Sequence, residues 1–169
     1  MLKTFVTCLA AYNNGYLHGR WVEVTSDPDD LRDAIAAVLA DSPAPGAEEH
    51  FFTDYDTALN MSVPFGEYES IETLCEFVEA VERCDDQEAF AAAYGEFYRE
   101  GLDSVIDRAD SCYRANTFQD FADQQADELL LHNVPEPARY YFDYDAHARD
   151  LRHDYTVIDG PSGCFIFTA

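Results

Sequence analysis

Residues 69–83 read ESIETLCEFVEAVER, and two patterns run through this stretch at helical spacing. Apolar residues recur three or four positions apart, which predicts a helix with one apolar face. Glutamates recur at the same spacing beside them. The apolar positions are Ile71, Leu74, Cys75, Val78 and Val81, and the acidic positions are Glu69, Glu72, Glu76 and Glu79. We therefore expect a packed helix that carries a row of carboxylates on its solvent side.

The sequence before this helix predicts a small α+β unit. Two β-rich runs, 3–10 and 17–25, flank an Asn13-Asn14-Gly15 step that is typical of a tight hairpin turn. A helix is expected over 26–41, because Pro28 suits a first helical position and Ser26 or Asp27 can cap it. A third strand is expected over 50–57.

The chain after residue 83 predicts further short helices and a final pair of strands. Residues 102–116 are expected to be less regular. Leu129 is expected to face inward from its helix. Expected helices lie at 86–100, 117–132 and 138–151, and expected strands lie at 155–159 and 164–168. The fold class predicted for the whole chain is α+β, with antiparallel strands and short helices.

Charge is the most unusual feature of the composition. The 169 residues include 34 Asp and Glu against 10 Lys and Arg, which gives a net charge of −24. A hydrophobic fraction of 47% and an aromatic fraction of 14% exclude a disordered acidic tail. Such a surface repels nucleic acid and anionic membranes and attracts basic proteins. Adaptation to salt, or biased genome composition, also produces acidic chains and stays open as an explanation.

Cysteine usage and hydropathy indicate a cytoplasmic, soluble protein. Five cysteines without a CxxC pair fit reduced thiols better than a disulfide framework. The apolar runs are too short for a signal peptide or a membrane span.

The acids keep a helical spacing in several places. Asp120, Asp123 and Asp127 form a second row. At 1.5 Å rise per residue, such rows place a carboxylate roughly every 4.5–6 Å along the helix axis. This is of the same order as the about 3.4 Å by which successive phosphates on one DNA strand advance along the duplex axis. The candidate acidic surface comprises Glu69, Glu72, Glu76, Glu79, Glu82, Asp85, Asp86, Glu88, Glu96, Glu100, Asp103, Asp107, Asp110, Asp120, Asp123, Asp127, Asp143, Asp145 and Asp150.

Residues 143–155, DYDAHARDLRHDY, contain four aspartates and two histidines in thirteen positions. A helix here could bring Asp143, His147 and Asp150 together, and His–carboxylate sets bind divalent metals. Arg149 and Arg152 within the group oppose a cation site, so local Asp–Arg pairing is the simpler interpretation. Phosphate-binding, hydrolase and zinc-binding motifs are missing from the sequence. We expect no enzyme, no metal and no cofactor, with a small metal-dependent enzyme as an alternative.

Three stretches, in order, resemble the ArdA antirestriction proteins. They are YNNGYLHGRW at 12–21, EYESIETL at 67–74 and ARYYFDYDAHARDL at 138–151. The resemblance implies an elongated, curved molecule of three small domains that forms a homodimer through its C-terminal part. It implies that surface carboxylates imitate the phosphates of bent B-form DNA.

The function that the resemblance implies is inhibition of type I restriction-modification enzymes. Such proteins occupy the DNA-binding groove, chiefly of the methyltransferase core, and block restriction and, more weakly, modification. Their genes are commonly carried on mobile elements. The three domains are expected at 1–68, 69–108 and 109–169, the last with the dimer contact. An acidic adaptor that binds another basic DNA-binding protein is the alternative of a different class.

Overall fold

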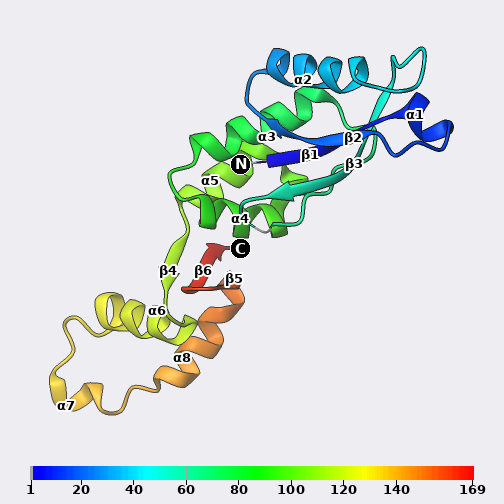
Figure 1. The fold of residues 1–169 in the computed structure, drawn as a ribbon. Coiled ribbons are helices and arrows are strands. Elements are labelled where there is room, and N and C mark those ends of the chain that lie inside the picture. Colours follow the sequence, from blue (N-terminus) through cyan, green and yellow to red (C-terminus); the bar gives the residue numbers. More distant parts are fainter. Residues whose placement is uncertain (1, 60) are drawn as a thin grey trace.

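The protein is described here by a computed structural model that covers residues 2–59 and 61–169. It contains two antiparallel three-stranded sheets together with short helices, so the predicted α+β class is confirmed. Figure 1 shows a molecule drawn out along one direction, from the first sheet at the upper right to α7 at the lower left.

The first sheet has the strand order β2-β1-β3. Its strands are β1 (Leu2–Cys8), β2 (Gly19–Val24) and β3 (His50–Thr57). The helix α2 (Pro28–Ala40) begins as predicted, because the Asp27 side chain accepts a hydrogen bond from the backbone N–H of Asp29 and Pro28 occupies the first helical position. Leu31, Ile35 and Val38 form the buried side of α2.

Three helices follow, of which the first packs against α2 and β2 and the other two pack against the first. They are α3 (Ile71–Arg83), α4 (Gln87–Phe97) and α5 (Leu102–Asp110). A 3₁₀ turn at Tyr98–Glu100 joins the last two. The predicted apolar stripe of α3 is buried at Leu74, Cys75, Val78 and Val81.

The second sheet has the strand order β4-β6-β5. Its strands are β4 (Tyr113–Ala115), β5 (Tyr155–Gly160) and β6 (Gly163–Thr168). The helices α6 (Phe118–Gln125), α7 (Glu136–Arg139) and α8 (Tyr144–Leu151) lie between β4 and β5 in the chain. Figure 1 shows them at the far end of the molecule from α2.

Strand β6 lies between two hydrophobic cores and contributes side chains to both. Phe165 and Phe167 join the main core, which also holds Phe52 of β3 and Phe90 of α4. The alternate residues Cys164 and Ile166 join a smaller core with Phe121 of α6. Burial on both faces explains why β6 reads as an uninterrupted apolar run. The main core is continuous across position 68/69, and the division into three domains stays a prediction.

The prediction of a tight turn between the first two strands is wrong, although the strands do form a hairpin. β1 and β2 do pair, from Leu2–Val24 to Thr7–Gly19. Between them lies the one-turn helix α1 (Leu9–Asn13), capped by the Cys8 thiol, which accepts from the Ala11 N–H. Gly15 still supplies the positive φ of 81° that ends this turn.

Three other expectations for secondary structure are wrong. The helix expected over 138–151 is two helices, α7 and α8, separated by residues 140–143. Residues 102–116 contain α5 and β4, although Leu102, Val105, Ile106 and Ala109 already had helical spacing. The helix predicted over 117–132 changes to a π-helical turn at Ala126–Leu130. Leu129 lies in that turn, where the spacing of an α-helix does not hold, so it is 65% exposed and does not face inward.

Arg114 connects the two halves of the fold. Its guanidinium group pairs with Asp86 at 3.3 Å and with Glu88, both at the start of α4. The same group lies 4.5 Å from the centre of the Phe165 ring, which is its cross-strand neighbour on β6. Asp86 is also the N-cap of α4.

We expect Arg114→Gln to lower the free energy of unfolding by about 1–2 kcal/mol, because it removes two half-exposed ion pairs and one cation–π contact. Chemical denaturation measures this. Arg114→Lys is the matched control, because it keeps the charge but lacks the planar guanidinium group. Its free energy of unfolding should lie between those of the parent and the Arg114→Gln variant. Equal stability of the Gln variant and the parent would contradict this account of the contact.

Candidate acidic binding surface

The acidic row of α3 begins at Glu72, three residues later than predicted. Ser70 is the N-cap of α3 and accepts a hydrogen bond from the Thr73 N–H. Glu69 therefore precedes the helix, is half-buried, and accepts from the Ser70 N–H at 3.2 Å. The helical row consists of Glu72, Glu76 and Glu79, all exposed. Their spacing of four and three residues places them on one face.

The carboxylates of this row differ in what they contact. Glu72 pairs with Arg32 of α2, which also contacts Asp29 at 2.7 Å. The Asp29 hydrogen bond, with a smaller effect of Glu72, raises the pKa of the Arg32 guanidinium above its usual value. Glu76 and Glu79 line a shallow depression whose far wall is the Arg83–Asp103 pair at 3.5 Å. Neither has an ion-pair partner within the described residues.

The row extends onto α2, which was missed from the sequence. Asp29, Asp30 and Asp33 are exposed on α2 and were not among the residues predicted for the acidic surface. The Arg32–Glu72 contact brings α2 beside α3, as Figure 1 also shows. The signal for the missed residues was the same spacing of three and four that marked the row on α3.

The second predicted row makes contacts within the protein. Asp120 forms a capping box with Thr117, and Asp123 accepts from the Gln119 amide at 2.7 Å. Asp127 accepts from the Tyr144 hydroxyl at 2.7 Å and lies 4.0 Å from Arg139. The hydrogen bond to Asp127 raises the pKa of Tyr144. These carboxylates stabilise helix ends and join α6 to α8, so they differ from the solvated row on α3.

The predicted acidic residues share one property, which is that none is buried in the described structure. Glu69, Asp86 and Asp123 are half-buried and the others are exposed. Within the described residues, ion pairs involve Glu72, Asp86, Glu88, Glu100, Asp103, Asp127 and Asp150. The Asp110 carboxylate accepts from the Cys84 thiol at 3.6 Å, and the Asp86 backbone oxygen accepts from the same thiol at 3.5 Å. No ion pair or side-chain hydrogen bond is found, over the same residues, for Glu76, Glu79, Glu82, Asp85, Glu96, Asp107 and Asp145.

The polar stretch at 143–155 begins with the N-cap of helix α8. The Asp143 side chain caps α8 by accepting from the Ala146 N–H at 2.9 Å. Asp150 lies 3.9 Å from Arg149, and the His147 ring lies against Phe142 with centroids 5.7 Å apart. Over residues 2–59 and 61–169, no three His, Cys, Asp or Glu side chains form a group that could hold a metal ion.

The cysteines are placed as core residues. Cys75, Cys84 and Cys164 are buried and Cys112 is half-buried. Burial raises the pKa of all four thiols above the usual value, with nearby carboxylates adding to the effect. At neutral pH these thiols are protonated, which is the unreactive form.

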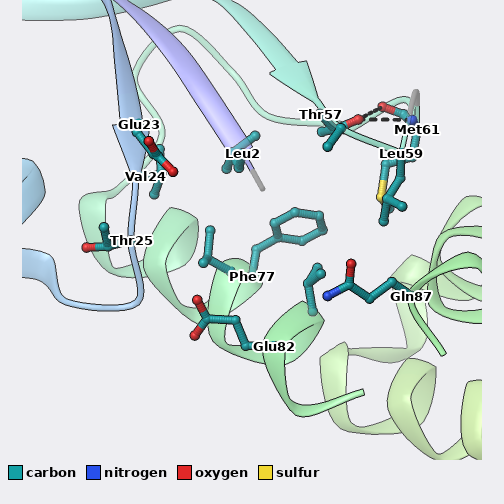
Figure 2. A pocket seen from close by; sticks show the side chains of 13 residues that line it. Leu2, Glu23, Val24, Thr25, Thr57, Leu59, Met61, Phe77, Glu82 and Gln87 are labelled. Atoms are coloured by element: carbon teal, nitrogen blue, oxygen red, sulfur yellow. Dashed lines mark hydrogen bonds between the residues drawn. The ribbon is translucent and has the colours of Figure 1, made fainter. Parts of the chain in front are cut away.

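One cavity of about 350 Å³ lies where the end of the first sheet meets α3. Figure 2 shows Leu2, Val24 and Phe77 around it, with Glu23 and Glu82 on opposite walls. Thr57 closes one side by exchanging hydrogen bonds with the backbone of Met61. Among the described lining residues, only Glu23 and Glu82 carry charge, and none is a His or Cys.

We expect salt to stabilise this protein. Going from 0.01 M to 1 M salt shortens the screening length from about 30 Å to about 3 Å, which weakens repulsion among the 34 acidic residues more than it weakens the few ion pairs. The thermal midpoint in sodium chloride should rise across this range. Potassium chloride is the control and should give the same curve. A falling midpoint would mean that ion pairs outweigh the repulsion.

No helix in the described part of the chain is long and apolar enough to cross a membrane. The fold and the surface define a small, strongly acidic α+β protein whose carboxylates lie in contact with solvent. A family model described as antirestriction protein (ArdA) matches residues 4–165. The chain therefore belongs to the ArdA family of antirestriction proteins, which connects it with restriction enzymes in general. A search of curated proteins found no match.

Proposed function

We propose that this protein mimics bent B-form DNA and competitively occupies the DNA-binding groove of type I restriction-modification enzymes, chiefly their methyltransferase core. Restriction, and more weakly modification, is blocked because the groove holds the protein instead of DNA. The protein itself performs no catalysis in this mechanism. Foreign DNA meets these enzymes in the cytoplasm, so we place the protein there, and a gene on a mobile element would benefit from it.

The observation that carries this proposal is the solvated row on α2 and α3. Glu76 and Glu79 are exposed and without ion pairs within the described residues, so their charge is available to a partner. A groove that neutralises phosphates with Lys and Arg can accept carboxylates at roughly 4.5–6 Å spacing. Each contact is weak, so affinity depends on the whole row and declines as salt rises.

The test is ATP-dependent cleavage of an unmodified plasmid by a purified type I enzyme, with this protein titrated in at low and at moderate salt. We expect inhibition at near-stoichiometric amounts, weaker at the higher salt, and no binding of the protein to the plasmid alone. An absence of inhibition with several such enzymes would reject the proposal. An acidic adaptor for another basic protein would then become the leading hypothesis.

We also propose that the protein is a homodimer through its C-terminal part. Leu129, Leu130, Tyr140 and Tyr141 are between 53% and 90% exposed around α7, which leaves apolar surface open in a single chain. Light scattering should give twice the 19.1 kDa of one chain. Tyr141→Lys should shift the mass toward one chain, and Tyr68→Lys, on the first half of the molecule, should not.

A further inference from the structure

In the described part of the chain, one face of the first sheet is exposed at Lys3, Trp21, Asp54 and Asp56. Leu2, Thr4 and Val6 of β1 point into the core beneath α2 and α3 and are buried. Side chains alternate along a strand, so Lys3 and Phe5 point to the opposite face. We call this the outer face and define it by Lys3, Phe5, Trp21, Asp54 and Asp56.

Phe5 is at the centre of the outer face, between an aromatic ring and a carboxylate. Its direct cross-strand neighbours are Trp21 on β2 and Asp54 on β3. The Phe5 and Trp21 rings have centroids 5.5 Å apart and planes at 81°. Trp21 remains 44% exposed and Asp54 is exposed. Opposed residues on neighbouring strands hold their side chains close enough to act together.

Gly19 fixes the position of the Phe5 ring. A Cβ atom at Gly19 would lie 2.7 Å from a carbon of that ring and 2.5 Å from the Val6 carbonyl oxygen. The ring therefore occupies the space that any other residue at position 19 would need. The aromatic surface continues toward Tyr12 and Tyr68, which contact Phe51 and are 53% and 74% exposed.

Elsewhere in the chain, the same combination of ring and carboxylate holds an arginine. Arg108 lies 4.0 Å from the centre of the Phe97 ring and 2.9 Å from Glu100. This hydrogen bond from Arg108 lowers the pKa of Glu100. Arg114 likewise lies over Phe165 while it pairs with carboxylates of α4. A planar guanidinium group can stack on a ring and donate sideways to a carboxylate at once, which an ammonium group cannot do.

The outer face presents that combination with no arginine in it. In the described part of the chain, no arginine lies over Phe5 or Trp21, and no cation pairs with Asp54 or Asp56. We propose that the outer face is an arginine-selective docking surface for a basic protein segment. Arginine side chains of the partner stack on Phe5 and Trp21 and donate hydrogen bonds to Asp54. Lys3, between the strands that carry Glu23 and Asp56, opposes the cation and limits affinity.

This inference concerns the opposite side of the sheet from the row on α2 and α3. It adds a preference for arginine over lysine to a surface that otherwise attracts any cation. It can fail while the DNA-mimic proposal stands, because a mimic built only of distributed charge makes no such distinction. It can also hold for a basic partner other than a restriction enzyme.

The experiment uses the intact protein, whose single tryptophan is Trp21. Two peptides of equal length and charge serve as probes, one with three arginines separated by glycines and one with three lysines. Trp21 emission follows each titration at moderate salt. We expect the arginine peptide to bind about fivefold more tightly than the lysine peptide.

Variants separate the docking surface from net charge. Asp54→Asn and Phe5→Leu should each bring the arginine-to-lysine ratio close to one, and thermal unfolding verifies that both are folded. Lys3→Gln should tighten binding of both peptides. The double variant Glu76→Gln, Glu79→Gln removes more charge but should leave the ratio unchanged. Equal affinity for the two peptides in the parent, or a ratio unaffected by Asp54→Asn, would overturn the proposal.

Discussion

Replacing Phe90 by alanine is expected to lower the free energy of unfolding by about 3–5 kcal/mol, the usual cost of removing a fully buried Phe. Phe90 is 0% exposed. Its ring meets Phe77 of α3 with centroids 6.0 Å apart and stacks on Tyr94 at 5.9 Å. The cavity left behind lies where three helices and β6 meet, so the loss is not confined to α4.

Chemical denaturation monitored by tryptophan emission and by circular dichroism measures this change. Trp21 reports the first sheet and circular dichroism reports all helices. Because the main core is continuous from β1 to β6, both signals should shift together by the same amount. Tyr98→Ala, at an exposed aromatic residue of the same region, is the control and should cost less than about 1 kcal/mol. A shift in circular dichroism alone would show that the first sheet unfolds independently.

Removing three carboxylates from α3 is expected to weaken inhibition of a type I restriction enzyme about tenfold. The variant is Glu76→Gln, Glu79→Gln, Glu82→Gln. All three residues are exposed and without ion pairs in the described part of the chain, so the fold should tolerate the change. Exposed charge pairs contribute about 0.2–1 kcal/mol each, and three of them together account for the expected loss. Removing one alone should have little effect.

The matched control removes the same charge elsewhere. Glu48→Gln, Glu49→Gln, Glu136→Gln changes three exposed residues that lie outside both rows. Inhibition titrations of plasmid cleavage compare the two triple variants with the parent. The control should inhibit within about twofold of the parent. If both variants weaken equally, net charge and not the row would determine binding, and the placement of carboxylates along α3 would have no role.

The sequence predicted those parts of the fold whose signals are local. Asp27 with Pro28, and the apolar spacing of α3, led to helices whose starts lie within two residues of those expected. Ser70 could have been identified as the N-cap of α3, which would have excluded Glu69 from the helical row. The strands of the first sheet were found because they are rich in β-branched and aromatic residues.

The features that the sequence did not predict depend on contacts between residues distant in sequence or on a change of helical geometry. Leu129 fits an α-helical stripe but lies in a π-helical turn, which sequence spacing does not reveal. Asp123 and Asp127 have the spacing of a solvated row, yet Gln119 and Tyr144 bind them. Tyr144 is 17 residues from Asp127, so only the packing of α8 beside α6 shows that this row acts within the protein.

The central claim is that this protein and DNA compete for one groove. The most direct measurement follows a fluorescent DNA duplex bound to the methyltransferase core of a type I enzyme while this protein is added. We predict complete displacement near one equivalent of this protein per DNA site, with a midpoint that moves to higher concentration as more DNA is present. A complex containing enzyme, DNA and this protein together, or DNA that stays bound throughout, would contradict the claim.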